Sequence, residues 1–133
     1  MPEPWPIVFM GTPRIAAETL AQLDQGPDPV VGVVTQPERQ AGRGQQTTPS
    51  PVRQFAESHD IPVLSPEKIR TADFHEQLRN CHPEVIVVVA YGRILPKSLL
   101  ELPPLGCLNV HYSLLPNYRG AAPAAWTCTR RAT

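Results

Sequence analysis

Asn109 and His111 are the residues in this sequence whose types and spacing first suggest chemistry. They stand two positions apart in "GCLNVHYS" (106–113), an apolar run that is typical of a buried β-strand. In a strand, side chains two positions apart project from the same face, so an amide and an imidazole would lie together. That pairing suits stabilisation of an oxygen that gains negative charge, together with transfer of a proton. The same residues would also fit a strand end that holds a histidine in a local hydrogen bond.

A glycine turn, "MGTP" (10–13), follows the first apolar run of the chain. A glycine that leads from a strand into the start of a helix is a ready site for an anion. The sequence has neither of the glycine patterns that mark dinucleotide and P-loop sites, GxGxxG and GxxxxGK[ST]. We therefore interpret the segment as a tight strand-to-helix turn in which Thr12 is the N-cap.

Two apolar turns are candidates for contact with a flat aromatic ligand. "YGRILP" (91–96) would offer backbone groups and an apolar wall through Arg93, Ile94 and Leu95. "SLLP" would close over the same ligand through Ser113, Leu114, Leu115 and Pro116. The alternative is that Ile94 and Leu95 simply belong to the core.

A basic loop, "ERQAGRGQQ" (38–46), is the candidate for contact with nucleic acid. Its two glycines flank Arg43, so this guanidinium would sit on a flexible backbone. Arg39 and Arg43 would suit contacts with phosphates. The segment exceeds the roughly two to six residues usual between a strand and a helix, which favours a function over an ordinary solvated loop. Its composition alone leaves both interpretations open.

The elements that would position these residues alternate along the chain. Apolar runs predict strands at 5–11, 29–37, 61–66, 84–92 and 106–113. Capping residues and spacing predict helices at 12–26, 50–60 and 71–81, with one or two helical turns at 95–103. This order predicts an α/β fold with an open, doubly wound and mostly parallel sheet. Ligands of such sheets bind beyond the carboxyl ends of the strands, where all the candidate segments fall.

Composition excludes several classes of function. Twelve Lys and Arg balance twelve Asp and Glu, which gives no global attraction to nucleic acid or to an anionic membrane. The three cysteines form no CxxC pair, so we expect reduced thiols in a cytoplasmic protein and no metal site. The longest apolar run, "VIVVVA", is too short to cross a bilayer, and the first residues do not read as a signal peptide.

Together these segments resemble the N-terminal part of the methionyl-tRNA formyltransferase family. The similar stretches are "IVFMGTP" (7–13), "VVTQPERQAGRG" (33–44), "TPSPV" (48–52), "VIVVVAYGRILP" (85–96), "GCLNVH" (106–111) and "SLLPNYRGAAP" (113–123). "NVH" with "SLLP" is a feature of folate-dependent formyltransferases in general. "MGTP" and "TQPERQAGRG…TPSPV" narrow the resemblance to the tRNA enzymes.

The resemblance implies a Rossmann-like formyltransferase fold that transfers a formyl group from 10-formyltetrahydrofolate to methionyl-initiator tRNA. By position, Asn109 would hydrogen-bond the formyl oxygen, and His111 would stabilise the tetrahedral intermediate and help to move protons. The folate would lie against the segment 93–95 and be lined by 113–116. The loop with Arg39 and Arg43 would reach the acceptor stem of the tRNA.

The sequence also departs from this family. The aspartate that completes the family's catalytic group has no match here, and the C-terminal β-barrel domain has none either. We therefore expect 1–126 to be the N-terminal part of a catalytic domain, incomplete at its C-terminal end, and 127–133 to be a tail unlike the family. Tyr112, Asn117, Arg14 and Ile15 also differ from the residues usual there. On this basis we expect a truncated form with weak or no activity.

Three alternatives remain open from the sequence. The chain would also suit another folate-dependent formyltransferase, acting on glycinamide ribonucleotide or an amino sugar, although the basic loop argues against a small acceptor. It would suit a non-catalytic module that binds folate or RNA. Finally, a sheet that ends at the strand 106–113 would expose an edge through which two copies could associate.

Overall fold

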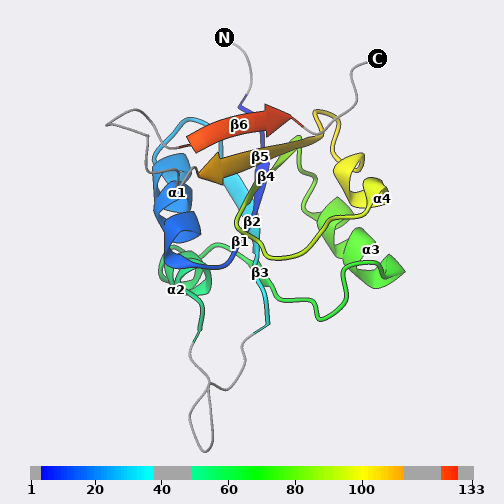
Figure 1. Ribbon diagram of the computed structural model, residues 1–133, viewed down its shortest axis with the longest axis horizontal. Coiled ribbons are helices and arrows are strands. Elements are labelled where there is room, and N and C mark those ends of the chain that lie inside the picture. Colours follow the sequence, from blue (N-terminus) through cyan, green and yellow to red (C-terminus); the bar gives the residue numbers. More distant parts are fainter. Residues whose placement is uncertain (1–3, 38–48, 113–123, 129–133) are drawn as a thin grey trace, which may run out of the picture.

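The computed structural model describes residues 4–37, 49–112 and 124–128, with the backbone alone at 111, 112 and 124–128. It confirms the predicted alternation of strands and helices (Figure 1). The strands are β1 (Ile7–Gly11), β2 (Val30–Val34), β3 (Val63–Leu64), β4 (Val85–Val89), β5 (Cys107–Tyr112) and β6 (Ala124–Cys128). The helices are α1 (Arg14–Asp24), α2 (Pro51–Ser58), α3 (Ala72–Asn80) and α4 (Lys97–Leu100).

All six strands form one sheet in the order β3-β2-β1-β4-β5-β6. The first five are parallel, which confirms the α/β class and the doubly wound arrangement. β2 and β3 are added in sequence on one side of β1, and the chain then crosses to the other side of β1, where β4 pairs with it. The switch point of the sheet therefore lies between β1 and β4, where ligands of such folds bind.

Each face of the sheet has its own core. On one face, Phe9 and Val89 pack with Leu20 of α1 and Ala56 of α2. On the other, apolar side chains of the sheet pack with those of α3 and α4, and this set includes Val8, Met10, Ile86, Val88, Phe74, Leu78, Leu99 and Cys107. Figure 1 shows the two helix pairs on opposite sides of the strands. The run "VIVVV" is apolar throughout because both of its faces are covered.

The alternative in which the strand 106–113 forms the exposed edge of the sheet does not hold, because β5 is not the outer strand. An additional strand, β6, pairs with β5 in antiparallel fashion, with Asn109 opposite Thr127 and position 111 opposite Ala125. β5 is therefore bonded on both sides, and β6 is the outer strand. The short, alanine-containing run "AAWTC" lacks the β-branched pattern by which the other strands were predicted.

The predicted role of Thr12 as the N-cap of α1 is also wrong. Pro13 occupies the cap position, and no side chain caps this helix. The Thr12 hydroxyl instead donates to the carbonyl oxygen of Tyr91 at 3.2 Å and accepts from the backbone N–H of Gln36 at 3.3 Å. Thr12 therefore links the ends of β1, β2 and β4 by hydrogen bonds and does not cap α1.

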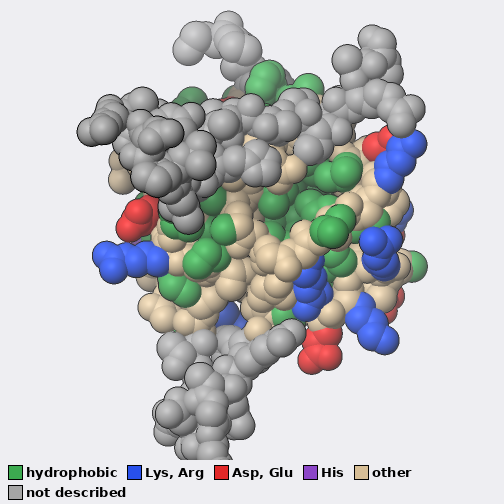
Figure 2. All heavy atoms as spheres, in the orientation of Figure 1, with side chains coloured by type: hydrophobic (Ala, Val, Ile, Leu, Met, Phe, Trp, Pro, Cys, Tyr) green, Lys and Arg blue, Asp and Glu red, His purple; other side chains and the backbone are tan. Residues whose placement is uncertain are grey.

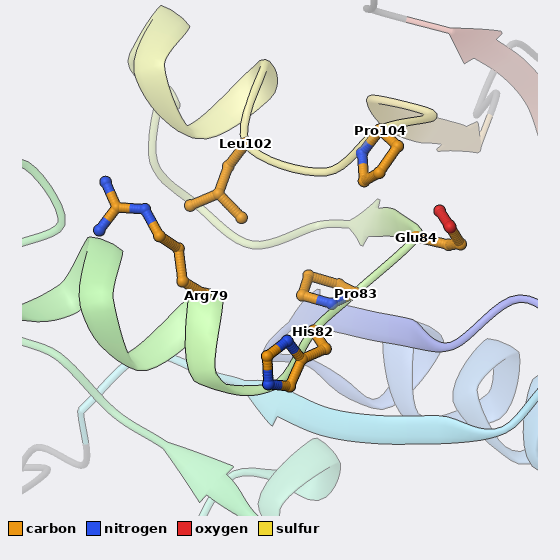
Figure 3. Close-up of a pocket in the computed structure, with 6 residues that line it drawn as sticks. All are labelled: Arg79, His82, Pro83, Glu84, Leu102 and Pro104. Carbon is orange, nitrogen blue, oxygen red and sulfur yellow. The ribbon is translucent and has the colours of Figure 1, made fainter.

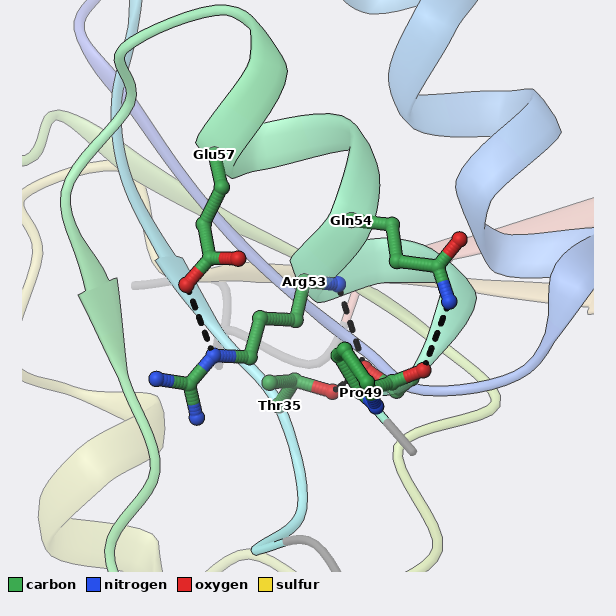
Figure 4. A network of polar contacts seen from close by, with 6 residues as sticks. Thr35, Pro49, Arg53, Gln54 and Glu57 are labelled. Carbon is green, nitrogen blue, oxygen red and sulfur yellow. Dashed lines mark hydrogen bonds and ion pairs between the residues drawn. The ribbon is translucent and has the colours of Figure 1, made fainter. Parts of the chain in front are cut away.

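The start of α2 is fixed by a small polar network (Figure 4). Ser50 caps this helix as predicted, since its hydroxyl oxygen accepts from the N–H of Arg53 at 3.1 Å. The same oxygen lies 2.9 Å from the hydroxyl of Thr35, which is completely buried at the end of β2. Because a buried hydroxyl needs a partner, this contact joins the two ends of the segment 36–49.

We predict that Ser50→Ala will destabilise the protein more than the equivalent change at another helix cap. Loss of the cap costs about 1 kcal/mol, and the buried Thr35 hydroxyl that loses its partner costs roughly 1–3 kcal/mol more. The matched control is Thr71→Ala, because Thr71 also caps a helix by accepting from the N–H of Phe74 at 3.2 Å. Equal free energies of unfolding for the two variants, measured in urea, would contradict this account.

A second prediction concerns Gly11, at the end of β1. A Cβ atom here would lie 2.6 Å from the carbonyl oxygen of Val89 and 2.7 Å from the Cβ of Ala16. Since these atoms belong to β4 and to the start of α1, Gly11→Ala should cost about 1–3 kcal/mol through overpacking. The control Gly26→Ala, whose nearest atom would be 3.3 Å away at an exposed helix end, should cost less. Thermal unfolding compares the two, and an undisturbed Gly11→Ala variant would refute the close approach.

Candidate functional site

The predicted chemical residues lie at the carboxyl edge of the sheet. Asn109 is half-buried in β5 and pairs with Val88 of β4. Cys107, two positions earlier, is buried in the core beneath α3 and α4, so strand alternation places Asn109 on that same face. The backbone of position 111 continues β5 opposite Ala125, and the side chain of His111 is outside the described part. The pairing of the two side chains therefore stays a prediction.

The loop that follows β4 begins beside this part of β5. Val89 pairs with Val110, so the loop from Ala90 to Pro96 starts one position further along the same edge. Ala90 and Gly92 adopt the left-handed region, with φ of 51° and 97°. A Cβ atom on Gly92 would lie 2.8 Å from Nε2 of Gln36, and the positive φ of this residue favours glycine. The end of β2 thus packs directly against the loop.

Arg93 fastens the same loop to a third strand end. Its Nη1 donates to the carbonyl oxygen of Glu67 at 2.8 Å and to that of Pro66 at 3.4 Å. These carbonyls lie between β3 and α3, more than twenty residues away in sequence. The guanidinium of Arg93, which was predicted to contact a ligand, therefore holds the loop after β4 against the loop after β3. Because its partners are backbone atoms, no side-chain pattern in the sequence pointed to this role.

Ile94 and Leu95, the other predicted wall residues, differ in their exposure. Ile94 is 87% exposed, so the interpretation of this residue as core is wrong. Leu95 is half-buried and packs against the core under α3 and α4. An exposed branched side chain next to a strand end is suited to contact with an apolar ligand surface.

A hollow of about 410 Å³ lies beside Ile94. Its lining residues come from the two loops that Arg93 joins: Glu67, Lys68, Ile69, Arg70, Arg93 and Ile94. This set contains three cationic residues and one carboxylate, so the net positive charge of the lining favours an anionic group. Apolar side chains are visible in the middle of the face shown in Figure 2, with Lys and Arg side chains along its right margin. Lys68 and Arg70 were missed from the sequence because they lie outside every motif.

Three buried polar atoms at this edge have no hydrogen-bond partner within the described ranges. They are Oε1 of Gln36, Oγ of Ser65 and the hydroxyl of Tyr91, which follow β2, β3 and β4. Burial raises the pKa of the Tyr91 phenol, and the nearby charge of Arg93 partly opposes that shift. Tyr91 thus stays neutral, with a hydroxyl that can donate or accept. Unpaired buried groups are uncommon, and here each belongs to a residue that follows the carboxyl end of a strand, where a ligand is expected.

The remaining predicted site residues lie outside the described residues and stay predictions. They are Arg39 and Arg43 of the basic loop, and Ser113, Leu114, Leu115 and Pro116 of the apolar turn.

Other parts of the described chain offer weaker sites. A hollow of about 480 Å³ at the opposite edge of the sheet is lined by Arg79, His82, Pro83, Glu84, Leu102 and Pro104. In Figure 3 the charged ends of Arg79 and Glu84 point in different directions, so its polar groups do not converge on a ligand. Among the described residues, no three His, Cys, Asp or Glu side chains gather as metal ligands. Every helix in those ranges is too short or too polar to cross a membrane.

We predict that Arg93→Ala will loosen the loops around this site. Losing the two bonds to the Pro66 and Glu67 carbonyls should lower the free energy of unfolding by about 1–3 kcal/mol, since the donor is charged. The matched control, Arg70→Ala, removes an exposed guanidinium that lines the same hollow. Hydrogen exchange of the backbone amides in 66–70 should quicken in Arg93→Ala and stay unchanged in the control. Unchanged exchange in both variants would show that Arg93 does not hold these two loops together.

Comparison with known proteins agrees with this architecture. The family model described as "Formyl transferase" matches residues 6–131. The chain is 57% identical over 120 residues to a methionyl-tRNA formyltransferase of Geotalea daltonii, and 56% identical over 122 residues to that of Trichlorobacter lovleyi. These matches cover 90% and 92% of this chain, but only 38% and 39% of the relatives' own length.

Solved structures with the same fold have more distant sequences. A phosphoribosylglycinamide formyltransferase from Anaplasma phagocytophilum superposes with a TM-score of 0.60 at 18% identity, over 89% of this chain and 54% of that one. The corresponding protein from Coxiella burnetii gives 0.55 at 23% identity, over 90% and 56%. These similarities concern the fold. The family match spans nearly the whole sequence, so this chain belongs to the formyl transferase family.

Proposed function

We propose that this chain is the N-terminal part of a methionyl-tRNA formyltransferase, with 1–126 belonging to the catalytic domain. The whole protein would transfer a formyl group from 10-formyltetrahydrofolate to the amino group of methionyl-initiator tRNA, in the cytoplasm, at the start of translation. The observation that carries the proposal is the identity of 54–58% to relatives named methionyl-tRNA formyltransferase, over about nine-tenths of this chain. The chain spans about 38% of the length of those relatives, so the activity belongs to the longer protein.

The proposed chemistry uses the carboxyl end of β5. Asn109 would donate its side-chain N–H to the formyl oxygen, which gains negative charge when the amino group attacks the formyl carbon. His111 would accept the proton that the attacking amine must lose. Asn109 is suited to this role because β5 is hydrogen-bonded on both sides, so little reorganisation would accompany the reaction.

The proposed donor site is the loop after β4. Exposed Ile94 and half-buried Leu95 would provide an apolar wall for the pterin and benzoyl rings, and the loop backbone would offer polar contacts. Residues with unpaired buried polar atoms and the exposed side chain of Ile94 all follow strand ends at this edge, which supports such a donor site. Arg93 would act chiefly by holding this wall in place. Residues 113–116 would complete the lining.

The proposed tRNA contact is the basic loop. Arg39 and Arg43 would bind phosphates near the acceptor end, where a guanidinium gives a paired contact. The hydrogen bond between Thr35 and Ser50 supports this proposal, since it holds together the two ends from which the loop extends. A small acceptor would need no such reach, which favours tRNA over glycinamide ribonucleotide.

We predict how substitution of Asn109 and His111 changes the rate of formyl transfer in a chimera. In this chimera the present chain replaces the matching segment of the Geotalea daltonii relative. The chimera should formylate methionyl-tRNA, and Asn109→Ala or His111→Ala should each slow the transfer by about 10²–10³-fold. His59→Ala, which removes an exposed histidine at the C-cap of α2, is the control and should leave the rate unchanged.

The acceptor is tested in the same chimera. Formylation of glycinamide ribonucleotide in place of methionyl-tRNA would overturn the proposed acceptor but keep the family chemistry. Binding of tetrahydrofolate by calorimetry without turnover of any acceptor would favour a binding module instead. Full activity in both Asn109→Ala and His111→Ala would remove these residues from the mechanism.

A further inference from the structure

A serine and a histidine meet between α3 and α4, apart from the residues assigned above. Nε2 of His75 lies 2.7 Å from Oγ of Ser98, and Nδ1 of the same ring lies 2.8 Å from the carbonyl oxygen of Thr71. His75 is half-buried on α3, while Ser98 is exposed on α4. Figure 1 shows these two helices next to each other on one side of the sheet.

The partners of the ring determine which nitrogen carries hydrogen. A carbonyl oxygen can only accept, so Nδ1 of His75 must donate its hydrogen to Thr71. In the neutral ring, Nε2 then holds the lone pair, and the hydroxyl of Ser98 donates to it. A nucleophile is thereby hydrogen-bonded to a base, and the base is oriented by a third group. This is the arrangement by which enzymes activate a serine.

A second serine–histidine contact in the same chain shows what is distinctive about Ser98. Oγ of Ser58 lies 3.0 Å from Nδ1 of His59, but it also donates to the carbonyl oxygen of Phe55 at 2.8 Å. Nδ1 of His59 lies 3.0 Å from that same carbonyl, so it too must carry hydrogen. Ser58 therefore faces a ring N–H rather than a lone pair. The two serines share a neighbour of the same type, but only Ser98 has a base.

We propose that Ser98 is a nucleophile activated by His75 and serves as an acceptor for acyl groups from activated acyl donors such as reactive esters. Oγ of Ser98 attacks the carbonyl carbon of the ester while its hydrogen passes to Nε2 of His75. The bond from that carbon to the leaving oxygen then breaks, and the hydrogen moves from Nε2 to the leaving group. The products are an acyl ester of Ser98 and the free alcohol, with neutral His75 restored. The exposed position of Ser98 leaves its oxygen open to such a donor.

The test uses 4-nitrophenyl acetate as the donor and the full 133-residue chain. Peptide mass spectrometry after short incubations should find acetyl groups on Ser98 well before Ser58. His75→Gln should slow acetylation of Ser98 by on the order of 10²-fold, the lower end of the contribution of a general base. Glutamine is chosen because its side-chain oxygen can still accept from Ser98, so the contact between the helices is retained without a base. His59→Gln is the matched control and should leave the labelling of Ser98 unchanged.

Three outcomes would overturn the proposal. The first is equal labelling of Ser98 and Ser58 in the unaltered chain, which needs no variant and so does not depend on the folding of one. The second is undiminished labelling of Ser98 in His75→Gln with circular dichroism unchanged. The third is acetylation confined to lysines and cysteines. Formyl transfer by the chimera described above is a separate measurement, so either proposal can fail alone.

Discussion

The close approach of β1 to β4 is the constraint on which the rest of this structure depends. At Gly11 the backbone comes so near to the carbonyl of Val89 that an added Cβ atom would force neighbouring atoms to shift. These two strands lie at the centre of the sheet. Between them the strand order changes direction, since β2 and β3 lie on one side of β1 and β4 to β6 on the other. A parallel pair at this place brings the loops after β1 and β4 to one edge, where ligands of such folds bind.

The loops at that edge are joined to one another by hydrogen bonds. Thr12 contacts backbone groups of Gln36 and Tyr91, and Arg93 contacts the carbonyls of Pro66 and Glu67. The ends of β1, β2, β3 and β4 are therefore connected by polar contacts across the top of the sheet. Such connections give the segment 90–96 a defined shape although it contains no regular secondary structure before α4. A surface for a rigid ligand needs this kind of support.

The sequence was sufficient to predict the strands and helices whose patterns are local. "VIVVV" indicated a central strand because both faces are covered, and Ser50 indicated a helix start through its own hydroxyl group. The helix 71–81 was indicated by the spacing of its apolar residues. The fold class followed from the alternation of these elements. Asn109 was correctly placed in a strand at the carboxyl edge, because periodicity and order along the chain are enough to fix that position.

The features that were missed depend on residues far apart in the sequence. Thr12 is of a residue type that often caps helices, but its hydroxyl donates to a carbonyl oxygen 79 positions away. Arg93 was expected to meet a ligand, and its bonds to backbone oxygens of another loop have no signature in residue type. β6 was overlooked because its pairing with β5 stabilises a run with weak intrinsic preference for a strand. In each case three-dimensional proximity outweighed local preference.

The pairing of β5 on both sides has a consequence for how such a protein can diversify. Neither neighbour of this strand can slide without breaking a ladder of backbone hydrogen bonds, so the amide of Asn109 is held in the frame of the whole sheet. The wall formed by Ile94 and Leu95 is held instead by a few side-chain contacts that single substitutions can alter. If the proposed roles hold, changes of ligand can arise in the loops while Asn109 keeps its place in the sheet.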